Sequence, residues 1–367
     1  MLRIGIFSNG KRHGKMAAEG YDDDLDEIVA ADGLGCCEAW ISEHIGINRP
    51  ATLPVPELLI AKTSALTSRI RLGVAVRCLP LYHPIDVATM AATCDHLTKG
   101  RYLFGFGGGG PETGMEQRGL KRTFRHEMML ESLDLILKCW TTQERFVYEG
   151  RFYRGERILV LPKPFQKPYP PMAVASSSDT FIDIAGREGY TLLCSHYENG
   201  ARLRPKIEKY LKAARQAGLE PDRHKISVCR QVYVADSAEE AKDDLREGAN
   251  YELEEDVRFF GDRHLKNFMP PSGRLEDVTF DQLADDGWFI LGDPERVYQG
   301  IKQLYDESGG FGTLLITMGR DWSTPEKRAR SMKLLMEEVY PRLAQLEPRP
   351  EASQSDYSSS LLGNVRM

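Results

Sequence analysis

The feature that most constrains the fold is a regular alternation of short apolar segments with longer segments of helical period. In residues 124–140, for example, Met129, Leu133, Ile136 and Trp140 recur at spacings of three and four, which predicts one buried helix face. Strand, helix, strand, helix is the order typical of a parallel sheet covered by helices. Eight strands are expected, at residues 3–9, 38–44, 69–80, 102–107, 171–176, 191–196, 225–235 and 312–318.

Eight strand-helix units in 367 residues favour an α/β fold of the (β/α)8 TIM barrel type over an open doubly wound sheet. We expect residues 1–346 to form this barrel with two additions. Residues 143–170 alternate around Gly150 and then become proline-rich, which indicates a hairpin excursion. Residues 248–286 are charged and interrupted by prolines, as in an insertion or lid. Residues 347–367 are expected to be a flexible tail.

The charge balance excludes some classes of function. The chain has 54 acidic and 48 basic residues, a net charge of −6, and no long basic stripe, so nucleic acid is not an expected partner. The absence of a long apolar run or a signal-peptide core predicts no membrane association and a cytoplasmic protein. The seven cysteines are scattered without a CxxC motif and are expected to be reduced thiols. The expected partners are small molecules or copies of this chain.

Glycines follow the fourth predicted strand, and the reactive groups of such barrels lie just after their strands. Residues 105–110 match GxGxxG, but Pro111 follows directly and no acidic strand end lies about 20 residues on, so a dinucleotide fingerprint is rejected. Gly107 and Gly108 either let a flat or anionic ligand approach the backbone or simply make a tight loop.

Serines follow the fifth predicted strand. Ser176, Ser177 and Ser178 stand where a helix begins, and the unpaired N–H groups and dipole of a helix start favour a phosphate. The alternative is a serine N-cap without a ligand.

Histidines supply the candidate proton-transfer groups. His44, beside Glu43, falls at the mouth of the predicted barrel, where an imidazole can exchange a proton near neutral pH. His83, His196 and Tyr197 are candidates to line the same mouth, although each is equally suited to stabilising a turn or packing against a loop.

The end of the first predicted strand argues against a metal site. It offers Ser8 and Asn9 and no His-x-His pair, so no catalytic or structural metal is expected. The basic segment 11–15 that follows is either a solvated loop or a region that attracts an anionic ligand.

Several short motifs together resemble the bacterial-luciferase-like family of flavin-dependent monooxygenases. They are residues 39–44 (AWISEH), 79–84 (LPLYHP), 97–102 (LTKGRY), 175–180 (ASSSDT), 290–297 (ILGDPERV) and 309–312 (GGFG). The resemblance implies a barrel that binds FMN at its mouth, as FMNH2 supplied by a separate NAD(P)H-dependent flavin reductase. O2 then forms a C4a-peroxyflavin that oxygenates a small apolar organic substrate. A homodimer is also implied. A deazaflavin-dependent hydride-transfer enzyme and a flavin-binding homologue without turnover remain alternatives.

The resemblance also assigns residues. His44 matches the histidine beside the flavin ring and is the candidate catalytic residue. Ala75 and Val76 match a pair that often forms a non-proline cis peptide against the ring. Residues 176–178 match the phosphate site.

One departure concerns the FMN phosphate. Relatives often carry an arginine in the loop after the fourth strand, whereas this chain has Gly108 and Gly109 there, and Arg118 is the next arginine. The phosphate is then held by backbone N–H groups and serines, or by Arg118 folding back.

Overall fold

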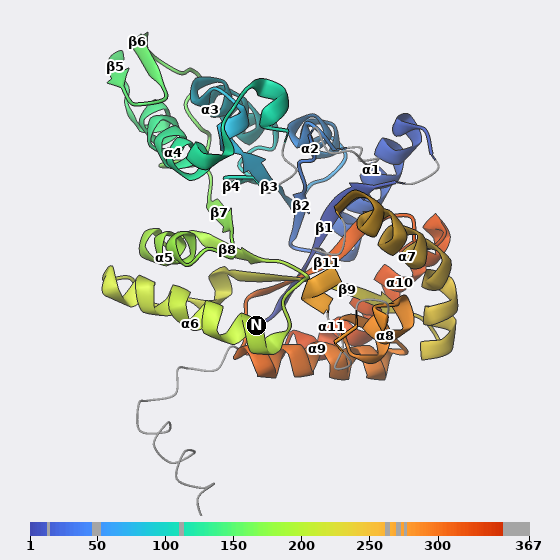
Figure 1. The fold of residues 1–367 in the computed structure, drawn as a ribbon. Helices are drawn as coiled ribbons and strands as arrows, with labels where there is room; N and C mark the ends of the chain where they lie inside the picture. Colours follow the sequence, from blue (N-terminus) through green and yellow to red (C-terminus); the bar gives the residue numbers. More distant parts are fainter. Residues whose placement is uncertain are drawn as a thin grey trace, which may run out of the picture.

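Eight parallel strands close into a barrel, with helices around its outside (Figure 1). The computed structural model describes residues 1–12, 15–45, 53–109, 114–260, 265–268, 273–274 and 277–347. The strand order β9-β11-β1-β2-β3-β4-β7-β8 returns to β9, which confirms the predicted (β/α)8 barrel. The barrel strands are β1 (Arg3–Lys11), β2 (Glu38–Ile41), β3 (Arg71–Cys78), β4 (Tyr102–Gly107), β7 (Met172–Ala175), β8 (Thr191–Cys194), β9 (Ile226–Val234) and β11 (Thr313–Arg320).

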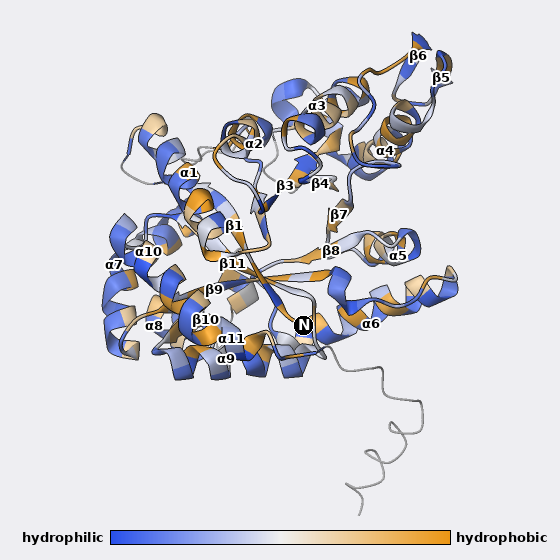
Figure 2. Ribbon diagram, turned by 180° about the vertical axis from the view of Figure 1, so that it is seen from behind, coloured by the Kyte–Doolittle hydropathy of each residue, from blue (hydrophilic) through white to orange (hydrophobic). Residues whose placement is uncertain are grey.

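The helices turn their apolar faces to the barrel. In α4, Met129, Leu133, Ile136 and Trp140 are all buried, as their spacing predicts. Hydrophobic residues concentrate on the strands, while hydrophilic residues spread over outer helices such as α6, α7 and α9 (Figure 2). The helices are α1 (Ala17–Leu34), α2 (Pro56–Ser64), α3 (Pro84–Leu97), α4 (Arg125–Thr141), α5 (Asp179–Glu188), α6 (Gly200–Gln216), α7 (Ala238–Phe260), α8 (Phe280–Asp285), α9 (Pro294–Ser308), α10 (Pro325–Leu334) and α11 (Tyr340–Leu343).

A layer of inward-facing side chains fills the barrel interior around Trp40, which is 1% exposed. Gly73 makes room for it: a Cβ on Gly73 would lie 2.5 Å from the Trp40 ring. The barrel is therefore packed below its mouth, and ligand space lies at the carboxyl ends of the strands.

Two additions interrupt the barrel repeat. The predicted hairpin is present as the antiparallel pair β5 (Phe146–Glu149) and β6 (Arg154–Ile158). The short strand β10 (Phe289–Gly292) was not predicted from the sequence. It pairs with residues 231–234 in the carboxyl-terminal half of β9.

The predicted insertion 248–286 begins inside a helix, because residues 248–260 form the C-terminal half of α7. Its residues 261–264, 269–272 and 275–276 lie outside the described residues, as do residues 348–367 of the predicted tail.

No helix in the described part of the chain is long and apolar enough to cross a membrane. All seven cysteines are free, as expected.

Candidate active site

A cavity of about 900 Å³ lies at the carboxyl ends of the barrel strands. This volume falls within the usual range for small-molecule and cofactor pockets. The cavity brings together predicted site residues from the carboxyl ends of five strands that are far apart in the chain. Those that line it are His44, Ala75, Val76, Gly107, Gly108, Ser176, Ser177, Ser178, His196 and Tyr197.

His44 lies in a loop and not in a strand. The predicted strand 38–44 is too long: β2 ends at Ile41, and the backbone N–H of His44 donates to the Leu53 carbonyl at 3.0 Å. The imidazole Nε2 lies 3.0 Å from Oδ1 of Asn9, at the end of β1. This contact fixes the ring at the edge of the cavity.

A buried arginine ties the His44 loop to β3. Arg77, 0% exposed, forms ion pairs with Glu43 and with Glu57 of α2. Glu43 also accepts a hydrogen bond from the backbone N–H of Cys78 at 3.3 Å. Burial raises the pKa of Glu43, although the Arg77 charge opposes the rise. The cluster holds the carboxyl end of β3 against the loop that carries His44.

β3 and β4 give the cavity an open wall. The Ala75–Val76 peptide bond is cis, as the resemblance predicts, and both residues line the cavity. A Cβ on Gly107 would lie 2.8 Å from Val76 Cγ2, and one on Gly108 would lie 3.1 Å from His126 Cδ2. Glycine at these positions therefore avoids these contacts and leaves the cavity wall open.

The serine turn precedes α5. Ser178 is the N-cap residue, but its side chain makes no capping hydrogen bond. Instead, the backbone N–H of Ser178 donates to Ser176 Oγ at 3.0 Å. Asp179, which begins the helix, is paired with Lys209 at 2.7 Å. The turn therefore does not form a simple serine N-cap. Its three serines line the cavity.

Arg122, Arg125 and Arg202, which the sequence analysis missed, line the cavity, and Arg118 does not. Arg118 is exposed, and its Nη1 donates to the Gly114 carbonyl at 3.4 Å. Arg122 begins the 3₁₀ turn Arg122–Phe124 that precedes α4, and Arg125 is the first residue of α4. Their Nε atoms are buried without a hydrogen-bond partner among the described residues. A signal was available, because both cations stand in the connection after the fourth strand, on the ligand side of a barrel.

The remaining predicted pocket residues, His83, His196 and Tyr197, differ in whether they line the cavity. His83 does not line the cavity: its Nδ1 accepts from the Ile85 N–H at 3.3 Å and caps α3. The rings of His196 and Tyr197 line the cavity with their centroids 3.9 Å apart, and Tyr197 also lies 5.3 Å from the ring of Phe268.

In the basic segment, Lys11 and Arg12 are buried and paired, whereas Lys15 is exposed and pairs with Asp23. Lys11, 1% exposed, pairs with Glu252 and Asp256 of α7, and Arg320 pairs with Glu252 at 2.9 Å. Burial alone would raise the pKa of Glu252, but the Arg320 and Lys11 charges hold that pKa below its usual value. Arg12, 2% exposed, pairs with acidic residues of α1. His13 lies outside the described residues.

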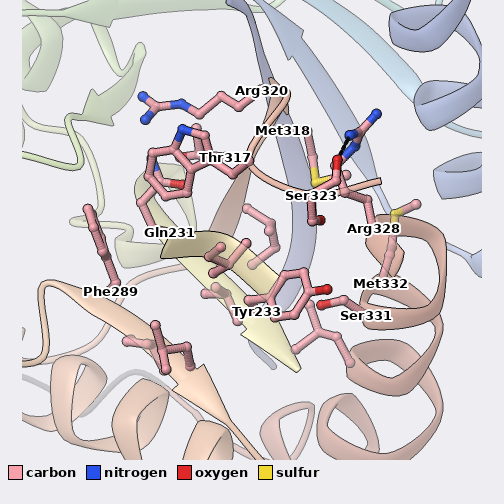
Figure 3. A pocket seen from close by; sticks show the side chains of 17 residues that line it. Gln231, Tyr233, Phe289, Thr317, Met318, Arg320, Ser323, Arg328, Ser331 and Met332 are labelled. Atoms are coloured by element: carbon pink, nitrogen blue, oxygen red, sulfur yellow. Dashed lines mark hydrogen bonds between the residues drawn. The ribbon is translucent and has the colours of Figure 1, made fainter. Parts of the chain in front are cut away.

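A second cavity of about 60 Å³ lies among β9, β10, β11 and α10 (Figure 3). Its walls include Gln231, Tyr233, Phe289, Thr317 and Met332. A water molecule needs about 10 to 15 Å³ of such volume, so this cavity has room for only a few waters and not for a flavin. The larger cavity is therefore the candidate active site.

Curated relatives match nearly the whole chain. 3,6-Diketocamphane 1,6-monooxygenase of Pseudomonas putida is 27% identical, over 92% of this chain and 97% of its own. Limonene 1,2-monooxygenase of Rhodococcus erythropolis is 28% identical, over 89% of this chain and 82% of its own.

Solved structures also resemble this chain over nearly its whole length. The oxygenating constituent of 3,6-diketocamphane monooxygenase from P. putida, a type II Baeyer-Villiger monooxygenase in complex with FMN, has a TM-score of 0.82 at 27% identity. It covers 95% of this chain and 99% of its own. An F420-dependent secondary alcohol dehydrogenase has a TM-score of 0.70 at 16% identity and shares the fold alone.

The family profile described as luciferase-like monooxygenase matches residues 2–310, which is most of the chain. The closed eight-stranded barrel and the cavity at its mouth fit that match. The chain therefore belongs to the luciferase-like monooxygenase family.

Proposed function

We propose that this protein is the oxygenase component of a two-component FMN monooxygenase. It takes FMNH2 from a separate NAD(P)H-dependent flavin reductase and uses O2 to oxygenate a small apolar organic substrate. The observation that carries the proposal is one cavity shared by His44, the Ala75–Val76 pair, the serine turn and two arginines. The relatives support it: one is named as an oxygenase component, and others act on camphane ketones and limonene.

The cavity fits FMN. Its volume of about 900 Å³ accommodates a tricyclic ring and a ribityl chain, and Gly107 and Gly108 leave the wall open beside Ala75 and Val76. FMN is therefore the cofactor of this monooxygenase, and the isoalloxazine ring is expected against that wall.

The phosphate of FMN is assigned to Arg122, Arg125 and the serines 176–178. A guanidinium suits a phosphate because its donors form a planar fork that matches two phosphate oxygens. The two arginines have buried Nε donors without partners among the described residues, so a bound anion would satisfy them. In this proposal, these arginines do the task of the arginine that relatives often carry where this chain has Gly108 and Gly109.

The protein's own residues have four tasks. FMN supplies the chemistry that activates O2. His44 holds or moves a proton beside the flavin ring. Ala75 and Val76 position the ring, while His196 and Tyr197 line the substrate side. The apolar packing below the cavity excludes water, which favours oxygenation over unproductive reoxidation.

Oxygen labelling tests the proposal. The protein, a flavin reductase, NADH and FMN are incubated under ¹⁸O2 with a panel of cyclic ketones and terpenes, and the products are analysed by mass spectrometry. One ¹⁸O atom in the product is the expected result. His44→Ala is expected to lower the rate of product formation about 100-fold with little change in FMN affinity, the usual scale for a positioned acid-base group.

The alternatives give other outcomes. Substrate turnover with a reduced deazaflavin and without O2 would favour hydride transfer. Tight flavin binding without any labelled product across the panel would favour a binding protein. Failure to bind flavin in either redox state would refute the proposed function altogether.

A further inference from the structure

We propose that Asn9 is a positioning residue that orients the imidazole of His44 and selects its tautomer. The motivating contact is the 3.0 Å distance between His44 Nε2 and Asn9 Oδ1. A carboxamide oxygen only accepts hydrogen bonds, so Nε2 carries the proton in this arrangement. Nδ1 then has the lone pair. The catalytic meaning of this choice rests on the proposed function, whereas the contact itself involves only protein atoms.

Asn9 is held in place by more than this one bond. Its side chain is buried, and its backbone carbonyl accepts from Ser42 Oγ at 3.0 Å. The backbone N–H of Ser42 donates in turn to the Ser8 carbonyl at 3.0 Å. The end of β1 and the loop after β2 are therefore tied together next to the His44 contact. An orienting residue needs such support, because its own rotamer must be fixed before it can fix another.

The backbone around Asn9 departs from regular strand geometry, and this departure sets the direction of the Asn9 side chain. The register between β1 and β11 shifts between Ser8 and Lys11, and Gly10 has a φ of 64°. On β11, Gly319 has a φ of 71°, and a Cβ there would lie 2.6 Å from the Asn9 nitrogen. Irregularities of this kind at the rims of barrels redirect side chains toward active sites.

The choice of amide over carboxylate has a chemical consequence. A carboxylate about 3 Å from an imidazole favours the charged ring, whereas a neutral amide orients the ring without favouring the charge. Asn9 therefore orients the His44 ring without placing a charge beside it.

Other charged groups of the cavity are mostly paired. On the elements nearest His44, Glu43 pairs with Arg77, and Lys11 pairs with Glu252 and Asp256. The remaining charged or titratable side chains that line the cavity are Cys78, Arg122, Arg125, His126, Cys194, His196, Tyr197, Glu198, Arg202, Lys206 and Cys229.

The tautomer can be observed directly in the complete protein. The chain has only eight histidines, so ¹⁵N labelling of the imidazole rings gives a simple NMR spectrum. His44→Gln assigns the His44 signals by their loss. We expect wild-type His44 to be the Nε2–H tautomer, and we expect Asn9→Leu to give a mixture of both tautomers.

Asn9→Asp supplies a nearly isosteric second variant in case Asn9→Leu does not fold. We expect it to raise the pKa of His44 by about one unit or more, and to shift the pH of half-maximal oxygenation with it. Asn250→Asp, which places the same new charge on α7, is the matched control and is expected to leave the His44 titration unchanged.

An unchanged tautomer ratio in folded Asn9→Leu, or an unchanged His44 titration in folded Asn9→Asp, would overturn the proposal. The NMR measurements need no flavin, so they can succeed even where the oxygenation assay fails. That combination would refute the proposed function while leaving the orienting role of Asn9 standing.

Discussion

Replacing Arg125 by methionine tests the phosphate assignment most directly. The guanidinium lines the cavity at the start of α4, and its buried Nε has no partner among the described residues, so the substitution removes a donor without breaking a described ion pair. A hydrogen bond to a charged group contributes about 1.5 to 3 kcal/mol. At about 1.4 kcal/mol per factor of ten, the Kd for FMN should rise roughly 10- to 100-fold.

Riboflavin makes this prediction specific, because it has the same ring and ribityl chain but no phosphate. Calorimetric titration of the oxidised flavins should show a weaker affinity of Arg125→Met for FMN and an unchanged affinity for riboflavin. Arg187→Met, at the exposed end of α5, is the control and should change neither affinity. Equal losses for both flavins, or no loss for FMN, would show that the phosphate is not held by Arg125.

Three further predictions concern the buried groups. Arg77→Met leaves two carboxylates buried without their cation and should lower the free energy of unfolding by about 3 to 5 kcal/mol in denaturant titrations. An effect below about 1 kcal/mol would contradict this account of the cluster. The folded-state pKa of Glu252 lies below its unfolded value of 4.5, so its stabilisation is present above that pH and is lost as the pH falls below it. The stability gap between wild type and Glu252→Gln should therefore narrow on acidification, and a constant gap would count against the Lys11 and Arg320 pairing. Burial raises the pKa of Cys194 to about 12, so iodoacetamide at pH 8 should alkylate this thiol slowly in the folded protein and quickly after unfolding; equal rates, followed by peptide mass spectrometry, would contradict its burial.

Local patterns were enough to predict most of the barrel. Each predicted strand corresponds to a barrel strand, and the capped start of α9 at Asp293 and Pro294 is visible in the sequence because capping is a local interaction. The short strand β10 was missed because it lies outside the repeat of eight strand-helix units and pairs with the carboxyl-terminal half of β9. The end of β2 was placed three residues too late for a similar reason: whether a strand continues depends on its neighbour.

The candidate site was only partly accessible from the sequence. His44 and the serine turn follow from motifs at strand ends, and the Ala75–Val76 pair from the family resemblance, whereas His83 lies in an equally plausible motif but caps a helix. Arg122 and Arg125 were overlooked because an arginine at a helix start ordinarily reads as a solvated residue.

The number and order of the strand-helix units follow from local patterns in the chain, and with them the end of the barrel expected to carry the ligand. The contacts at that end follow from the closed fold. Lys11 is buried in an ion pair with Glu252, which is 241 residues away in the chain. His44 is oriented by Asn9, 35 residues earlier. The physical reason is that periodicity and capping act within a few residues, while closing a ring of eight strands brings distant segments together and sets which polar groups lose water and which find partners.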